Sequence, residues 1–497
     1  MGIIQKDASQ TMLISYTGII LGYINKGLLF LIILSTEQIG LINLIYSIGM
    51  LFAQFANFGA IYSTWKFLPF FKNTERKHFG FFPFILSIVL LGIITCSALF
   101  WFFQVDIQSL YSEKAKGFNP YFFWVLPIGI SYVLFMFFEV YLRAFYKNIF
   151  SVFALEIVLR LALTILLLLL WCKVINFHNF VILHSVIYII PTLLLLYYLL
   201  KIKEFNINYS TIAISKKFKK IILQFSAFNY LNTLGTVLVN SLDVIMLAHI
   251  LGLKETGVFT TVVFLASALQ VPYKSLIRIS APIISDYWKK REFSKMKELY
   301  QKVSSISLLI GLGTFLPIWM NIDFLFSFLK PEFQEGKWVF LFLMIGKLLD
   351  MYFGLNGSIF STSKKYKFDI LFTILLIVTV YSLNLVLIPM WGISGAAIST
   401  SIALVFYNIG RVIFVWRIYK MHPFSMNQFK IIGLAILTLF AGYLSKTLAT
   451  NSFVNVLIQC LIILVLFVFP IIRYDLESES VAFLKRFRNK FNKNQLK

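Results

Sequence analysis

The sequence predicts an all-α polytopic membrane protein with fourteen transmembrane helices and both termini in the cytoplasm. Three observations support this fold class. Hydrophobic residues make up 59% of the 497 residues and charged residues only 13%, whereas soluble domains carry about 25% charged residues. Apolar runs long enough to cross a bilayer recur along the whole chain. Lysine and arginine gather in every second connection between these runs, as expected when cytoplasmic loops collect basic residues.

A helix needs about 20 mostly apolar residues to cross the hydrocarbon core. The first six predicted spans are Thr11–Leu34, Ile39–Trp65, Phe81–Phe103, Tyr121–Tyr141, Phe150–Trp171 and Val181–Leu200. The next six are Ile221–Leu247, Gly257–Ile279, Val303–Phe328, Trp338–Phe360, Phe368–Ile388 and Gly392–Trp416. The last two are Phe429–Leu448 and Phe453–Ile472.

The distribution of basic residues sets the orientation of these spans. With the N-terminus inside, and with residues near the end of a span counted with the adjoining segment, inner segments hold 34 of the 45 lysines and arginines and outer segments hold 7. The other four lie within predicted spans: Lys26, Arg160, Lys347 and Arg411. The net charge of +24 is therefore mostly a consequence of membrane topology. Membrane lipid is the expected partner of the basic tail FLKRFRNKFNKNQLK, and no nucleic-acid partner is expected.

The chain also matches itself at an offset of 217 residues. Gly40 then aligns with Gly257, and the segment LSTEQIG aligns with LGLKETG. Because the repeat contains six spans, an even number, the halves have the same orientation and are related by an axis along the membrane normal. At this offset Lys26 aligns with Asp243. The predicted domains are 1–215, 216–425 and 426–497, which hold spans 1–6, spans 7–12, and spans 13–14 with the basic tail.

The stretch GIILGYINKGLLFLIILS carries Lys26 near the middle of the first span. A charge at the bilayer centre costs about 2.5–3.5 kcal/mol on insertion scales, so it usually faces a bundle interior or a wet cavity. Lys26 lies about 12 Å along the helix from Leu34. A structural role, in which the side chain extends toward the membrane surface, therefore stays open beside an anion-binding role.

Several buried charges are spaced for ion pairs on one helix face. The pairs are Glu156 with Arg160, Glu139 with Arg143, and Lys347 with Asp350. Structural pairing and substrate binding both remain open for these residues.

Lys26, Arg278 and Arg411 have no partner of opposite charge within a helical turn. We therefore expect them to line a cavity and to bind an anion. The planar fork of arginine suits a phosphate group, and lysine acts as a point charge.

Two segments resemble a known family. LSTEQIGLINLIYSIGMLFAQFANFGAIYSTWKFLPFF resembles the first hairpin of the Wzx-type polysaccharide flippases, which belong to the multidrug/oligosaccharidyl-lipid/polysaccharide (MOP) superfamily. MWGISGAAISTSIALVFYNIGR resembles the small-residue start of their twelfth span. The resemblance extends over the whole chain in the number and orientation of spans.

This resemblance implies two six-helix lobes around a central cavity, followed by two further helices. It implies that undecaprenyl-pyrophosphate-linked oligosaccharide moves from the inner to the outer leaflet of the bacterial cytoplasmic membrane, for O-antigen or another surface polysaccharide. Polysaccharide polymerase machinery is an implied partner. The expected substrate-binding residues are Lys26, Arg278, Arg411, Arg160, Lys347 and Arg143. Asp243 and Asn384 are expected at a site for a coupling ion, sodium or proton. No other cofactor is expected.

Two other classes of function stay open. A drug/cation antiporter of the same superfamily would favour acidic groups in the first span, which instead carries Lys26. A polysaccharide polymerase or ligase would need a sizeable outer loop with catalytic groups, but the longest outer segment, Gln104–Pro120, is short. The chain has no G-x-x-x-x-G-K-[ST] pattern for ATP binding. We therefore expect a transporter and not an enzyme.

Overall fold

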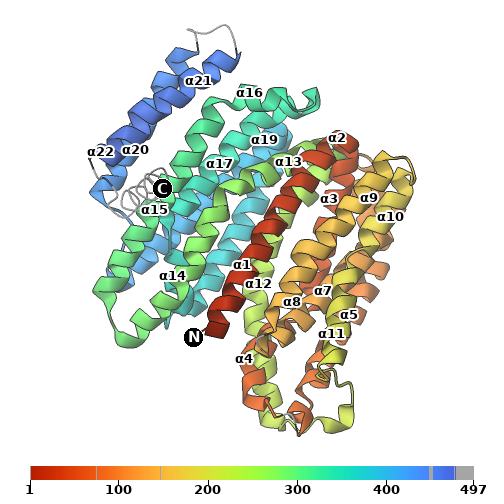
Figure 1. The fold of residues 1–497 in the computed structure, drawn as a ribbon. Coiled ribbons are helices and arrows are strands. Elements are labelled where there is room, and N and C mark those ends of the chain that lie inside the picture. The colour runs from red at the N-terminus through yellow and green to blue at the C-terminus, as the bar shows by residue number, and fades with distance from the viewer. Residues whose placement is uncertain (1, 74, 146, 447–451, 475, 477–497) are drawn as a thin grey trace, which may run out of the picture. The chain divides into compact units, whose positions relative to one another are not determined.

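The computed structural model describes residues 2–73, 75–145, 147–446, 452–474 and 476, and the basic tail from Phe483 lies outside these residues. The described residues form helices and connecting segments, without a strand (Figure 1). The contacts between residues divide the chain into two compact units. The first comprises Met1–Phe264 and Asn384–Ile393, and the second comprises Leu265–Leu383 and Ser394–Lys497. The domain boundaries derived from the sequence repeat stay a prediction.

The first unit is built mainly from helices that begin before residue 254. They are α1 (Gly2–Gly22), the π-helix η1 (Tyr23–Leu29), α2 (Phe30–Ile33), α3 (Thr36–Ala56), α4 (Ala60–Phe71), α5 (Phe81–Phe102), α6 (Gln104–Tyr111), α7 (Val125–Ala144), α8 (Asn148–Phe153), the π-helix η4 (Ala154–Val158), α9 (Leu159–Trp171), α10 (Phe177–Val186), α11 (Ile189–Lys201), α12 (Lys216–Ile250) and α13 (Leu253–Ser267). Short 3₁₀ turns, η2 (Lys77–Gly80), η3 (Lys116–Trp124) and η5 (Tyr209–Thr211), connect them.

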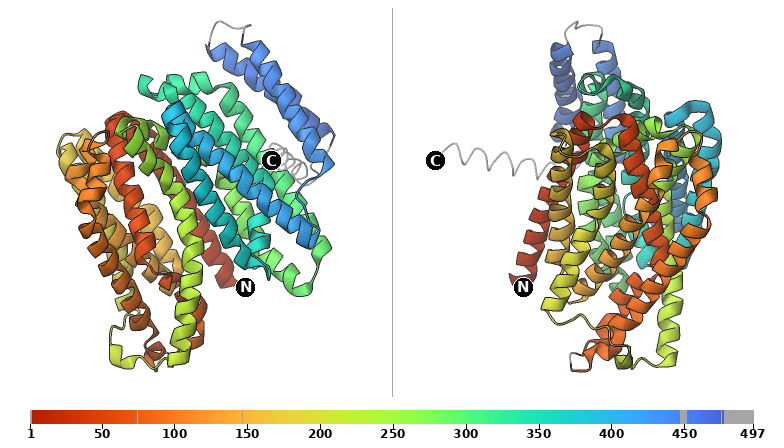
Figure 2. Two further views of the ribbon diagram at one scale, coloured as in Figure 1. Left: turned by 180° about the vertical axis from the view of Figure 1, so that it is seen from behind. Right: turned by 90° about the vertical axis from the view of Figure 1, so that its right-hand side faces the viewer.

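The second unit holds the remaining helices. They are α14 (Val271–Lys290), α15 (Phe293–Met320), α16 (Ile322–Ser327), α17 (Gly336–Phe353), α18 (Asn356–Thr362), most of α19 (Asp369–Tyr419), α20 (Met426–Ser445), α21 (Ser452–Ile463), the π-helix η9 (Leu464–Val468) and α22 (Phe469–Arg473). The 3₁₀ turns are η6 (Ala268–Gln270), η7 (Pro331–Glu335) and η8 (Tyr366–Phe368). Both views in Figure 2 show α20 beside the rod formed by α21, η9 and α22.

Eleven helices of the described chain are long and apolar enough to cross a membrane, or twelve if the bent pair Pro331–Phe353 and Asn356–Thr362 counts as one span. The protein is therefore a multi-pass membrane protein. The sequence predicted fourteen spans, and this number and the cytoplasmic location of the termini stay predictions. Two helices account for part of the difference between fourteen and eleven spans. The single helix α19 covers two predicted spans, and α12 contains the seventh predicted span but is not among the eleven.

The 51 residues of α19 fold back on themselves. A straight helix would separate Asp369 and Arg411, 42 residues apart, by about 63 Å, yet their side chains form an ion pair. The reversal occurs at Gly392, whose backbone has φ 59° and ψ −138°, a conformation that suits glycine because it has no Cβ. Predicted span twelve begins at this residue.

The second predicted span is interrupted. Phe58 and Gly59 have positive φ angles of 43° and 72°, so α3 ends at Ala56 and α4 starts at Ala60. The side-chain Oδ1 of Asn57 accepts a hydrogen bond from the Gly59 backbone at 2.7 Å. Such local bonds offer the backbone an alternative to the helix, which explains why the continuous span Ile39–Trp65 was wrong.

Positions related by the sequence repeat contact each other directly between α3 and α13. A Cβ on Gly40 would overlap the carbonyl oxygen of Leu253, and a Cβ on Gly257 would overlap that of Thr36. The Asn43 side chain also donates a hydrogen bond to Thr260, 217 residues away, at 3.2 Å. The two helices therefore cross with the near-twofold symmetry that the repeat predicts, and glycine allows their backbones to touch.

We expect Gly40→Ala to lower the free energy of unfolding by about 1–3 kcal/mol, since the added methyl group meets backbone that has no room to yield. Gly313→Ala in α15 is the matched control, because a Cβ there meets nothing within 4 Å. The control should be neutral or gain up to about 1 kcal/mol from helix propensity. The denaturant midpoints of the purified proteins in micelles measure the stability of both variants. Equal midpoints for Gly40→Ala and Gly313→Ala would contradict the close helix crossing.

Candidate functional site: a basic cavity in the first unit

A cavity of about 280 Å³ lies among the first-unit helices. It is lined by Gly22, Asn25, Lys26, Tyr46, Tyr132, Leu155, Glu156, Leu159, Arg160, Leu163, Ile187, Tyr188 and Phe264. Ligand sites span roughly 300–1,000 Å³, so this volume suits a headgroup better than a whole oligosaccharide. The cavity contains two of the predicted substrate-binding residues, Lys26 and Arg160.

Both helices that carry the charged residues are distorted at the cavity. Lys26 lies in the π-helix η1, and Glu156 lies in the π-helix η4. Such π segments inside α-helices are rare and frequently occur at functional sites. Gly18 and Gly22 let the two helices approach, because a Cβ on Gly18 would overlap the Glu156 side chain and one on Gly22 would overlap the Arg160 guanidinium.

Arg160 is held firmly in place. Its Nη2 lies 2.5 Å from the Glu156 carboxylate, and its Nη1 donates a hydrogen bond to the Gly18 carbonyl. Its own carbonyl accepts a hydrogen bond from the Asn25 side chain at 2.8 Å, and Thr164 donates to Asn25 at 2.8 Å. The predicted Glu156–Arg160 pair is thus confirmed. The hydrogen bonds of Arg160 to Gly18 and Asn25 also join the fifth predicted span to the first, a link that the sequence did not reveal.

Lys26 differs from Arg160 because it forms no ion pair with any residue of the described chain. Its Nζ lies 5.2 Å from the ring centroid of Tyr46, within the range of a cation–π contact. Two cations and one carboxylate therefore face the cavity, which leaves it a net positive charge.

Aromatic hydroxyl groups form the other side of the cavity. Tyr46, Tyr132 and Tyr188 line it, and the Tyr46 and Tyr188 rings lie 5.8 Å apart. Tyrosine combines an apolar ring with a hydroxyl group that can donate or accept a hydrogen bond. The sequence analysis missed these residues and Asn25, because single polar residues in apolar spans carry no spacing signal.

Asp243 and Asn384, the two residues expected at a coupling-ion site, lie next to each other. The Asn384 side chain donates a hydrogen bond to the Asp243 carboxylate at 2.8 Å, although 141 residues separate them. Both side chains are buried, and the Oδ1 of Asn384 accepts no hydrogen bond within the described residues. Buried polar atoms are nearly always satisfied, so this acceptor oxygen beside a carboxylate fits a hard cation.

A second polar network lies within the second unit. Gln270 donates to Asp350 at 3.2 Å and accepts from Lys347 at 3.2 Å, while Asn408 donates to Asp350 at 2.9 Å. The spacing of Lys347 and Asp350 left a direct ion pair open, and the structure shows Gln270 bridging the two side chains instead. Gln270 lies in the 3₁₀ turn η6, far in sequence from Lys347 and Asp350. The sequence analysis considered only partners within one helical turn and therefore missed it.

Arg411 also differs from the prediction. It lines a cavity of about 360 Å³ in the second unit, but it forms an ion pair with Asp369 and lies 4.1 Å from the Tyr407 ring. Its partner is far away in sequence and is brought close by the reversal at Gly392. The expectation of an unpaired charge was thus wrong for Arg411.

The last two predicted site residues lie apart from the basic cavity. Arg143 forms its predicted ion pair with Glu139, and more than half of its side chain is exposed. Arg278 is exposed on α14 and lines neither polar cavity. The structure therefore brings together Lys26 with Arg160, and Asp243 with Asn384, but not all eight residues.

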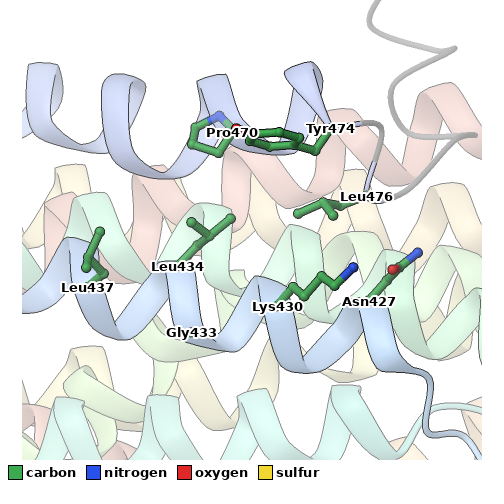
Figure 3. A pocket seen from close by; sticks show the side chains of 8 residues that line it. All are labelled: Asn427, Lys430, Gly433, Leu434, Leu437, Pro470, Tyr474 and Leu476. Atoms are coloured by element: carbon green, nitrogen blue, oxygen red, sulfur yellow. The ribbon is translucent and has the colours of Figure 1, made fainter.

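A larger, mostly apolar cavity of about 620 Å³ lies between α20 and α22. Figure 3 shows Lys430 and Asn427 at one end of it, with Leu437 farther along α20 and Pro470 across from them. None of the predicted site residues lines this cavity.

The chain was compared with protein families, curated proteins and solved structures. No protein-family model matches the chain. A 204-residue segment, 41% of this chain, is 21% identical to the capsular polysaccharide biosynthesis protein CapF of Staphylococcus aureus, and the match spans about half (51%) of that protein.

Solved structures match more of the chain. The lipid II flippase MurJ in an inward closed conformation has a TM-score of 0.71 and 16% identity, over 94% of this chain and 98% of that one. An inward-facing multidrug resistance MATE transporter of the MOP superfamily has a TM-score of 0.61 and 13% identity, over 80% and 94%. The MATE multidrug transporter DinF-BH has a TM-score of 0.54 and 16% identity, over 82% and 95%. The chain therefore shares the fold of the MurJ flippase and of these MATE transporters.

Proposed function

We propose that the chain is a flippase that moves undecaprenyl-pyrophosphate-linked oligosaccharide from the inner to the outer leaflet of the bacterial cytoplasmic membrane, for surface polysaccharide synthesis. The observation that carries this proposal is the net positive cavity in which Lys26 has no carboxylate partner among the described residues. A cation costs free energy at this depth, and an anionic substrate offsets that cost. The fold of a lipid II flippase and the likeness to a capsule biosynthesis protein support the same reading.

The residues of the cavity take distinct roles in this proposal. Lys26 neutralises one charge of the pyrophosphate. Arg160, held by Glu156 and Gly18, offers its remaining N–H groups in a fixed direction, and Arg is suited to phosphate through its planar fork. The tyrosine hydroxyls supply neutral hydrogen bonds. The sugars and pyrophosphate cross through the cavity while the lipid tail stays in the bilayer, and the cavity opens alternately to each side.

Asp243 and Asn384 provide the coupling site in this mechanism. A carboxylate and an amide oxygen suit a sodium ion, which prefers oxygen ligands, whereas a proton needs only the carboxylate. The unsatisfied Oδ1 of Asn384 therefore favours sodium. Because the two residues come from α12 and α19, ion binding there ties helices that are far apart in sequence.

A multidrug antiporter is the second candidate, since MATE transporters share the fold. The net positive charge of the first-unit cavity opposes a cationic substrate, so the observations favour the flippase.

Purified chain in proteoliposomes separates the two functions. We expect it to move a fluorescent undecaprenyl-pyrophosphate-linked sugar between leaflets, read as loss of protection from a membrane-impermeant quencher. A cationic dye such as ethidium should not be transported. Transport of the dye without movement of the lipid would replace the flippase with the antiporter.

A further inference from the structure

A groove of about 730 Å³ in the second unit lies outside both sites described above. It is formed by the end of α15, α16, the start of α17, and the helices α20 and α21. The bias of basic residues places this end of the helices at the outer face. The side chains that decide its chemistry are Trp319, Asp323, Lys337, Trp338, Lys446 and Gln459.

Three charged side chains meet at the outer end of the groove. The Asp323 carboxylate accepts a hydrogen bond from Lys337 on one oxygen at 2.9 Å and from Lys446 on the other at 3.0 Å. The hydrogen bond from Lys337, aided by Lys446, holds the pKa of the Asp323 carboxyl below its usual range, so the carboxylate is ionised at neutral pH. The cluster therefore has a net charge of +1, and each ammonium group has two N–H donors left.

Below this cluster the groove is apolar and open to the lipid. Its α20 wall extends from Ile436 to Lys446, a rise of about 15 Å and thus half of the roughly 30 Å hydrocarbon core. Ile436, Phe440 and Tyr443 on this wall are each more than 60% exposed. The Trp319 and Trp338 rings lie 6.2 Å apart near the charged end, as expected for aromatic residues at a membrane interface.

Gln459 adds one buried polar group to the groove. The side chain is fully buried, and its Oε1 has no hydrogen-bond partner within the described residues. It lies about 10 Å along α21 from Ser452. Its Nε2 donates a hydrogen bond to the Asn455 side chain at 3.4 Å.

We propose that this groove binds one outer-leaflet phospholipid whose headgroup carries a single negative charge and no positive charge. The phosphodiester lies between Lys337 and Lys446 and neutralises the +1 cluster, and an acyl chain follows the exposed face of α20. A zwitterionic lipid leaves the cluster charged, and a dianion overcompensates it. The occupant is a lipid and not a protein segment because the groove descends one leaflet deep into the hydrocarbon.

Native mass spectrometry of the purified full chain, titrated with dioleoyl-phosphatidylglycerol or dioleoyl-phosphatidylcholine, tests this proposal. One tightly bound phosphatidylglycerol is expected, with a clear preference over phosphatidylcholine. Lys337→Gln should weaken phosphatidylglycerol binding about fivefold, since one basic group near a lipid surface contributes about that factor. Lys173→Gln, which removes an exposed basic residue elsewhere in the chain, should change nothing.

Asp323→Asn gives the sharpest contrast. It raises the cluster to +2 and should tighten phosphatidylglycerol binding, whereas a purely structural ion-pair cluster predicts no gain in lipid affinity. Equal binding of the two lipids, retention of the preference in Lys337→Gln, or weaker binding in Asp323→Asn would each overturn the proposal. Lys337→Arg, which keeps the charge, should retain the preference. These lipid measurements do not depend on flippase activity.

Discussion

Replacing Lys26 by methionine should weaken binding of undecaprenyl pyrophosphate about 10- to 100-fold. A hydrogen bond to a charged group contributes about 1.5–3 kcal/mol, which corresponds to that range of affinity. Lys26 has no carboxylate partner in the described chain, so its charge is available to the substrate. Methionine keeps most of the apolar stem and removes only the ammonium group. Titration of the purified chain with undecaprenyl pyrophosphate measures the loss.

The stability of the same variant distinguishes the functional role from a structural one. Removing an unpaired charge from an apolar setting relieves a desolvation cost, so Lys26→Met should be as stable as the wild type or more stable. Lys26→Arg should keep much of the affinity, because it retains the charge. A Lys26→Met protein that binds the lipid normally but unfolds more easily would show that the lysine is structural.

Replacing Asp243 by asparagine should abolish the stimulation of transport by an ion gradient. A coupled charge that crosses the membrane contributes about 2.3 kcal/mol per 100 mV, and the neutral side chain has no charge to hold the ion. Asparagine preserves the size of the side chain and can still hydrogen-bond to Asn384. Proteoliposomes with an imposed sodium gradient, compared with a proton gradient of the same size, provide the measurement.

Asp286→Asn is the control for this variant, because Asp286 is exposed on α14. It should transport at the wild-type rate under both gradients. Sodium stimulation that survives in Asp243→Asn would remove Asp243 from the coupling site. Stimulation of the wild type by protons alone would replace sodium with a proton and leave Asn384 without a role as a ligand.

The sequence predicted the features that arise from local patterns. Hydropathy correctly predicted a multi-pass membrane protein, and i, i+4 spacing correctly predicted the pairs Glu156–Arg160 and Glu139–Arg143. Gly40 and Gly257, which the repeat aligns, also contact each other in the structure. Each of these follows from periodicity or from symmetry, which a single sequence displays directly.

Contacts that depend on tertiary folding were not visible. Arg411 seemed unpaired because Asp369 lies 42 residues away, and Gln270 separates Lys347 from Asp350. Asn25, next to Lys26, has its hydrogen-bond partners Arg160 and Thr164 on the fifth predicted span. The tyrosines of the cavity come from helices that share no sequence pattern. In each case a partner from another helix decides the role of the residue.

The sidedness of lipid-linked oligosaccharide in cells that lack this chain tests the central claim most directly. Such cells, complemented with the wild type or with Lys26→Met at matched expression, are treated with a membrane-impermeant reagent that labels sugars on the outer leaflet. The flippase proposal predicts precursor trapped on the inner face in the deletion and in Lys26→Met, and normal exposure with the wild type. Normal exposure of the precursor in the deletion strain would contradict it.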